Sequence, residues 1–251
     1  MTIWWALYVK EWKDARYVFS FLIVGLVVLG AYGAINFEPD LVAVGPRALL
    51  SYIPFILGGA ACFIAPPFLL ARSFSAEWKS DTHYQMFSLP VPKFVPALAK
   101  YLVAVSNGFL MFVVIGGFMF WVGVENWGGV DKPRVAYDDV VILMGMGFLA
   151  YLMMMLGFVT AMEGVKFAVK RFQRLAAVGF CVVALYFYLW FYWQIVGVLD
   201  FFGTFKVDSV INGQFVMVIA EIAFASFVYP AFVGVLLLVL GLGLFEKYVE
   251  I

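Results

Sequence analysis

Six stretches of this chain are long and apolar enough to cross a lipid bilayer, and they constrain its fold more than any other feature. They comprise residues 17–35, 49–71, 101–124, 140–162, 175–199 and 222–245. A hydrocarbon core of about 30 Å needs about 20 apolar residues as helix, and backbone groups in lipid must be hydrogen-bonded within the segment. With 65% hydrophobic and 13% charged residues, the chain falls in the membrane class. We therefore expect an all-α polytopic membrane protein, with residues 1–251 forming a single transmembrane domain.

The basic residues predict how the six spans are oriented. The ends and loops on the side of the two termini hold twelve Lys and Arg residues, whereas the loops on the opposite side hold four. Cytoplasmic loops carry an excess of basic residues. We therefore expect a multi-pass protein of the cell (plasma) membrane with both termini in the cytoplasm.

The segment before the first span has an amphipathic pattern. At helical spacing its aromatic residues Trp4, Trp5, Tyr8 and Trp12 share one face, and its lysines lie on the opposite face. This pattern is typical of a helix that lies in the membrane interface, and we predict one over residues 1–16. Glu11 lies at the edge of the apolar face and should need a partner. The alternative is an ordinary cytosolic extension of the first span.

Two further segments carry local signals. Residues 200–221, in the last outer loop, are too polar to span the bilayer but too apolar for a solvated loop, so we expect a short helix or a re-entrant turn there. Pro54, Pro66 and Pro67 lie in the second span, and we expect them to kink it or to end it near Ala65.

The sequence offers little chemistry of its own. The spans contain no ionisable residue away from their ends, which is unfavourable for ion-driven transport. The chain lacks a phosphate-binding loop, His83 is its single histidine, and Cys62 and Cys181 lie within apolar runs. We therefore expect no enzymatic activity, no metal site and no cofactor in this chain. Its formal charge of zero predicts no nucleic-acid partner.

The polar loop between the second and third spans, residues 72–96, has the character of a docking element. It begins with a helix-compatible stretch that contains Glu77, continues to the apolar pair Met86 and Phe87, and ends in a rigid turn at Pro90 and Pro92. A short surface helix braced by such a turn could act as a lever for a partner. The alternative is a passive loop whose aromatic residues face lipid.

This loop resembles the cytoplasmic loop of ABC-2 type (type V) permeases, a family of six-span exporters. The matching residues are Arg72, Ser73, Phe74, Glu77, Thr82, Met86, Phe87, Ser88, Leu89, Pro90, Val91, Lys93, Lys100 and Tyr101. The chain departs from the family pattern at Asp81, at the Tyr84–Gln85 pair and at Lys93, where the family commonly has Arg. The N-terminal segment also resembles the family's amphipathic connecting helix.

The resemblance implies a permease subunit that forms a translocation path as a homodimer or heterodimer and is coupled to a separate cytosolic ABC ATPase, which would bind ATP and Mg. A coupling helix would contact that ATPase through Glu77, Lys79, Asp81, Thr82, His83, Tyr84, Gln85, Met86 and Phe87. A second cytoplasmic contact would involve Lys166, Lys170 and Arg171, and an outer segment at 210–220 would form the exit gate. The alternative function is a non-transporting membrane scaffold that recruits a cytosolic partner.

Overall fold

The computed structural model describes residues 3–36, 46–79, 91–126, 134–135, 137–169, 172–211 and 214–248. Within these ranges the helices are α1 (Ile3–Ile35), α2 (Pro46–Lys79), α4 (Phe94–Asn126), α5 (Tyr137–Ala168), α6 (Gln173–Val198) and α7 (Ala225–Tyr248). All six are long and apolar enough to cross a membrane. The prediction of a multi-pass helical membrane protein is confirmed at this level.

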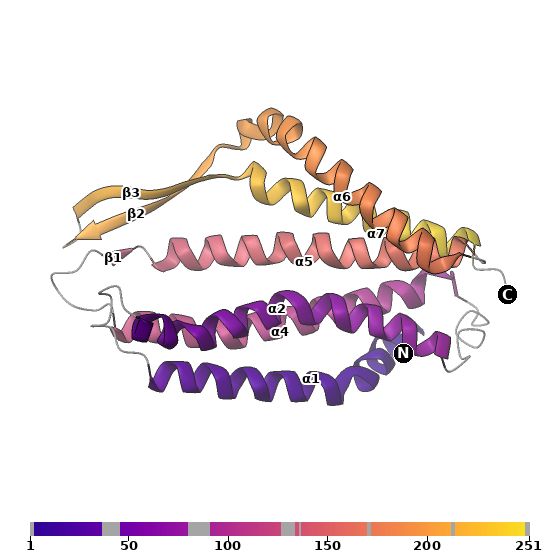
Figure 1. Ribbon diagram of the computed structural model, residues 1–251, viewed down its shortest axis with the longest axis horizontal. Coiled ribbons are helices and arrows are strands. Elements are labelled where there is room, and N and C mark those ends of the chain that lie inside the picture. Colours follow the sequence, from indigo (N-terminus) through magenta and orange to yellow (C-terminus); the bar gives the residue numbers. More distant parts are fainter. Residues whose placement is uncertain are drawn as a thin grey trace.

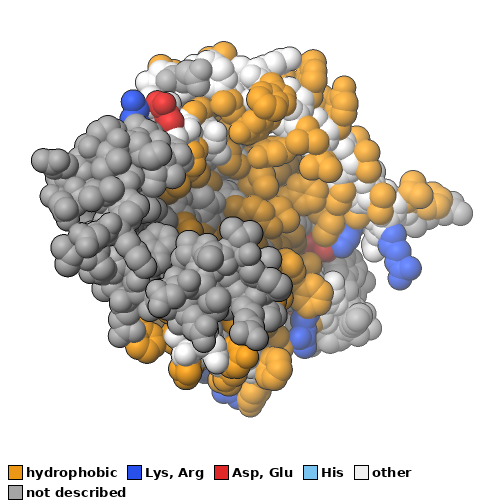
Figure 2. Space-filling model, turned by 60° about the vertical axis from the view of Figure 1, so that its left-hand side comes forward, with side chains coloured by type: hydrophobic (Ala, Val, Ile, Leu, Met, Phe, Trp, Pro, Cys, Tyr) orange, Lys and Arg blue, Asp and Glu red, His pale blue; other side chains and the backbone are white. Residues whose placement is uncertain are grey.

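The helices lie side by side, with α1 at one edge, α2 and α4 next to it, then α5, and finally α7 and α6 (Figure 1). The described ends of the chain lie at the same end of this assembly, as an even number of spans requires. Hydrophobic side chains cover much of the described part of the face seen in Figure 2, where charged ones form only a few separate patches. Such a surface suits lipid rather than water.

The second predicted span continues beyond its predicted end. We expected the span to give way to a polar loop after residue 71, and its prolines to kink it or to end it near Ala65. Instead, α2 is a single helix of 34 residues with Pro54, Pro66 and Pro67 inside it, so the early end is wrong. At 1.5 Å per residue it is about 50 Å long, well above the roughly 30 Å of the hydrocarbon core. Residues 72–79 therefore extend α2 past the membrane-length segment, because a helix that leaves lipid no longer needs apolar residues.

The predicted helix or re-entrant turn over residues 200–221 is wrong. Only Leu199–Phe202 forms a short 3-10 helix, and β2 (Thr204–Ile211) and β3 (Gln214–Ala223) then form an antiparallel hairpin that projects from the end of the assembly opposite the termini (Figure 1). The short strand β1 (Arg134–Val135) pairs with β2. The described part of the chain is therefore not entirely α-helical.

The closest helix packing joins α5 and α7. A Cβ atom placed on Gly157 would lie 2.1 Å from the carbonyl oxygen of Gly234, and one on Gly164 would lie 2.9 Å from that of Gly241. Gly157 and Gly164 are seven residues apart on α5, as are Gly234 and Gly241 on α7. The two backbones therefore touch at two levels, and the two helices run in the same direction. Small residues allow such close approach in membranes, where van der Waals packing drives association.

Candidate functional site

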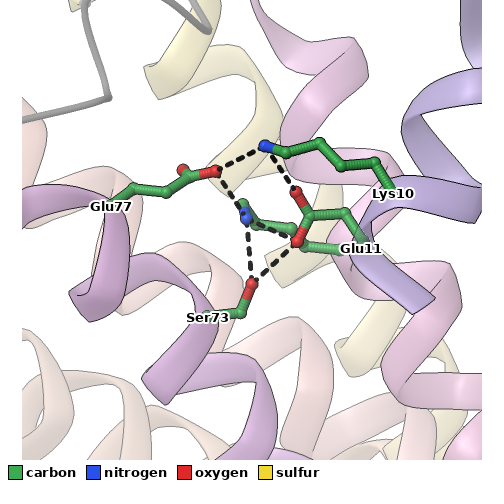
Figure 3. Close-up of polar contacts among 5 residues, drawn as sticks. Lys10, Glu11, Ser73 and Glu77 are labelled. Carbon is green, nitrogen blue, oxygen red and sulfur yellow. Dashed lines mark hydrogen bonds and ion pairs between the residues drawn. The ribbon is translucent and has the colours of Figure 1, made fainter. Parts of the chain in front are cut away.

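A buried polar cluster joins three helices at the end of the assembly that carries the termini (Figure 3). The Lys100 ammonium, on α4, lies 2.7 Å from Glu11 Oε2 on α1, 2.8 Å from Glu77 Oε1 on α2, and 2.9 Å from Ser73 Oγ on α2. Ser73 in turn donates a hydrogen bond to Glu11 Oε2 over 3.1 Å. The three N–H groups of the ammonium thus have three acceptors.

The cluster contains more negative than positive charge below its surface. The side chain of Lys100 is 1% exposed and those of Glu11 and Glu77 are 7% and 12% exposed, so two shielded carboxylates face one shielded ammonium. Lys10, which is 53% exposed, approaches from the rim at 3.7 Å from Glu11 and 3.9 Å from Glu77. Burying charges is costly unless they are paired and hydrogen-bonded, so this cluster holds its three helices in a fixed arrangement.

The cluster supplies the partner that Glu11 was expected to need. The helix α1 is continuous from Ile3, and its first turns bend toward α2 and α4 in Figure 1. Tyr8 of the same segment makes a 3.0 Å hydrogen bond with Ser106 on α4. Trp4, Trp5 and Trp12 stack with or lie near the Tyr8 ring. The N-terminal segment is therefore fixed against the bundle, and its position in a membrane interface remains a prediction.

The same end of α2 and α4 also contacts α7. The Phe74 ring stacks on Phe245, with 5.3 Å between ring centroids, and both residues are buried. The backbone N–H of Phe94, at the start of α4, donates to Glu246 Oε2 over 3.2 Å. A carboxylate at a helix N-terminus is favourable because it faces the unpaired amides and the positive end of the helix dipole. The described residues on either side of positions 80–90 are thus anchored to the bundle.

The predicted contact residues are only partly described. Glu77 and Lys79 belong to the last turns of α2, whereas residues 81–87 of the predicted coupling helix lie outside the described residues. In the second predicted contact, Lys166 lies on α5 and forms an ion pair with the buried Glu163. Lys170 and Arg171 lie outside the described residues.

A second feature, at the level of the spans, is an apolar cavity between α5, α6 and α7. Its volume is about 570 Å³, and its walls include Met154, Phe158, Phe187 and Phe232. The buried Tyr229 of α7 donates a hydrogen bond to the backbone oxygen of Tyr188 on α6 over 2.8 Å. Most of the large apolar residues of α6 are exposed. Its described contacts with α5 include Phe180 with Phe158 and Cys181 with Met162.

Among the described residues, no group of three or more His, Cys, Asp or Glu side chains is placed to hold a metal ion. In comparisons with known proteins, no family model matches the chain, and no curated protein or solved structure is significantly similar to it.

Sequence reasoning missed Lys100 and Ser73 as members of one cluster with Glu11. In the sequence these two residues stand out only as matching positions of the loop resemblance, because the pairing between α1 and α4 spans 89 positions of sequence. The available signal for the cluster was that Glu11, Glu77 and Lys100 each lie near the end of an apolar run.

Proposed function

We propose that this chain is the permease subunit of an ATP-driven exporter, coupled through residues 77–87 to a separate cytosolic ATPase. The observation that carries the proposal is the way in which both ends of this segment are fixed. Glu77 is its first residue and Lys100 follows it on α4, and the two side chains form an ion pair.

Such anchoring suits the transmission of force. A partner that pushed the segment would move the ends of α2 and α4 together, and Glu11 would make α1 follow. The contact of Phe74 with Phe245 extends the connection to α7. Rigid-body movement of packed helices is a common way for a local push to become a global change.

Two copies of the chain would enclose the path. The apolar cavity between α5, α6 and α7 offers walls that suit a hydrophobic or amphiphilic cargo, and the hairpin of β2 and β3 at the opposite end occupies the place proposed for the exit gate. ATP and Mg would be bound by the partner, and this chain would perform no bond chemistry.

The second candidate function is a membrane scaffold that recruits the same cytosolic partner without moving cargo. It is favoured by the dense anchoring of α1, α2 and α4, which would serve a static platform equally well. The two functions differ in whether nucleotide moves the helices.

Partner capture and movement can be tested separately. A photo-reactive amino acid at position 84 should crosslink a cytosolic P-loop ATPase in cells, whereas the same group at position 214, on the hairpin, should not. Spin labels on Thr204→Cys in a C62A/C181A background should then report a change in the distance between two copies when the purified complex binds ATP. A scaffold would give the crosslink but no change in distance.

A matched pair of insertions tests the lever itself. Two glycines inserted between Lys79 and Ser80 should preserve the crosslink and abolish the nucleotide-dependent distance change, because the partner would then push on a flexible joint. Two glycines inserted between Asn212 and Gly213 at the hairpin should leave the change intact. An ATPase-independent transport activity of the isolated chain would refute the proposal.

A further inference from the structure

One exposed face of α1 is basic at one end and apolar along the rest. The helix α1 lies at the edge of the assembly (Figure 1), and Lys13, Arg16, Tyr17, Phe21 and Val24 are exposed on it. These residues follow one another at intervals that keep them on one side of a helix, turn after turn. The face therefore changes from cationic to apolar at Tyr17, where the predicted first span begins.

The two cations of this face lack an acidic partner in the described part of the chain. The neighbouring cleft between α1, α2 and α4 is lined by three basic and three acidic side chains, so its charges balance. They are Lys10, Arg72, Lys100, Glu11, Asp14 and Glu77. Lys13 and Arg16 do not line this cleft, and neither forms an ion pair with a described carboxylate. Their positive charge is therefore left uncompensated on the outer side of α1.

Tyr17 holds the guanidinium of Arg16 on this face. The guanidinium carbon lies 4.6 Å from the centre of the Tyr17 ring, and Arg16 donates a 2.7 Å hydrogen bond to the Tyr17 hydroxyl oxygen. A guanidinium carries several N–H donors in a planar fork, so the others stay available to an oxygen ligand. Because Lys13 lies one turn before Arg16, its ammonium can reach the same ligand. Such a pair suits a phosphate group, to which both side chains make charge-assisted hydrogen bonds.

We propose that this face binds an anionic phospholipid of the surrounding bilayer. The phosphate would accept N–H bonds from Lys13 and Arg16, and the acyl chains would lie against Phe21 and Val24, which are 79% and 61% exposed. A zwitterionic lipid brings its own cation beside the phosphate, so an uncompensated basic pair favours the anionic lipid. Anionic lipids give the cytoplasmic leaflet its negative surface, and the asymmetry of basic residues predicts that this end faces the cytoplasm. The site does not depend on the proposed transport function.

Titration of the purified full chain with two lipids tests the charge preference. Phosphatidylglycerol carries a net negative charge, whereas phosphatidylcholine with the same acyl chains carries none. Native mass spectrometry in a nonionic detergent gives the apparent dissociation constant of the first molecule bound of each lipid. We expect phosphatidylglycerol to bind at least tenfold tighter, because each cation at a membrane surface favours anionic lipid. Equal affinities would overturn the proposal.

Two double variants separate this face from the general charge of the same end of the assembly. Lys13→Gln with Arg16→Gln removes both cations of the face and should weaken phosphatidylglycerol binding at least tenfold. Arg174→Gln with Lys247→Gln removes the same charge from exposed positions at the start of α6 and the end of α7, which lie at that end (Figure 1), and should leave the binding unchanged. Equal weakening in both would overturn the proposal, as would wild-type affinity in the folded K13Q/R16Q protein.

A third variant and a headgroup analogue test the two halves of the site. Tyr17→Leu keeps both charges but removes the ring and the hydroxyl that hold Arg16, so it should weaken phosphatidylglycerol binding several-fold and leave phosphatidylcholine binding unchanged. Glycerol 3-phosphate carries the phosphate without acyl chains, and an excess of it should not displace the bound lipid. Unchanged phosphatidylglycerol affinity in Y17L would overturn the role of Tyr17 in the site, and displacement by glycerol 3-phosphate would overturn the assignment to a bilayer lipid.

Discussion

At the scale of single residues, Lys100 contributes most to the stability of the polar cluster. It is the shielded cation between Glu11 and Glu77, which come from two other helices. Removing one partner of a buried ion group leaves an uncompensated charge, which costs far more than the net contribution of the pair. Lys10 contacts the same carboxylates from a solvated position and should matter little by comparison.

This contrast gives a first prediction. Lys100→Met should destabilise the protein by about 3–5 kcal/mol, because two carboxylates lose their buried counter-charge. Lys10→Met should cost about 1 kcal/mol or less. Thermal unfolding of the two variants in the same detergent, followed by circular dichroism, measures the difference. Equal losses of stability would show that Lys100 is not the residue that neutralises the cluster.

A second prediction concerns the base of the hairpin, outside the spans. A hydrogen bond from Thr204 over 2.7 Å, aided by Lys206 at 3.6 Å, lowers the pKa of the Glu221 carboxyl below its ordinary value of 4.5. Because the pKa of Glu221 is lower in the folded state, its ionised carboxylate stabilises the hairpin above pH 4.5. This contribution is lost as the pH falls through the lowered pKa. The protection factors of the hairpin amides, which compare their exchange rates with those of an unstructured chain at the same pH, should therefore fall in that acid range.

The matched variants are Glu221→Gln and Thr204→Val. The first should remove this acid-dependent change, and the second should raise the pKa of Glu221 toward its ordinary value in a carbon-13 NMR titration of the carboxyl group. An unchanged titration in Thr204→Val would contradict the assigned cause.

At the scale of elements, the seam between α5 and α7 depends on glycine. A Cβ on Gly234 would lie 2.5 Å from backbone atoms of Met153, so the backbones would have to separate, whereas nothing lies within 4 Å of a Cβ on Gly243 of the same helix. The seam therefore sets the distance between α5 and α7, and through α7 the position of Phe245 under the polar cluster.

We predict that Gly234→Leu destabilises the protein by about 1–3 kcal/mol or more, because overpacking forces rigid backbones apart. Gly243→Leu, with the same change in hydrophobicity, should be close to neutral. The monodispersity and thermal midpoint of the two purified variants measure the effect. Similar behaviour of both would mean that the seam tolerates separation.

Two elements show where sequence reasoning succeeded and failed. The apolar runs predicted six helices, but the ends of α2 were misplaced because hydropathy reports the thickness of the bilayer and not the length of a helix. The hairpin was missed although its signal was present. Asn212–Gly213 separates two stretches rich in β-branched and aromatic residues, and the register pairs Ile211 with Gln214 across it. Asn-Gly at such a position is a strong hairpin signal.

At the scale of the whole molecule, the chain has two chemically different ends. The polar cluster and the described chain ends lie at one, and the hairpin lies at the other (Figure 1). The asymmetry of basic residues predicts that the first end faces the cytoplasm.

Labelling of intact cells tests this orientation. In a C62A/C181A background, a membrane-impermeant maleimide should react with Gln214→Cys on the hairpin but with Lys247→Cys only after permeabilisation. The reverse result would invert the topology and remove the basis for a cytosolic partner at residues 77–87.

The sequence by itself determined the number of spans and their approximate places, because the cost of exposing polar backbone or charge to lipid is a local property of each segment. It also distinguished the amphipathic segment 1–16 and the polar loop 72–96 from the apolar spans. Only the tertiary structure decided that Glu11, Glu77 and Lys100 meet in one cluster and that Lys13 and Arg16 remain outside it. Those facts depend on which helix faces pack together, and this is decided by steric fit at sites such as Gly58 of α2, where a Cβ atom would lie 2.5 Å from the Ile115 side chain of α4.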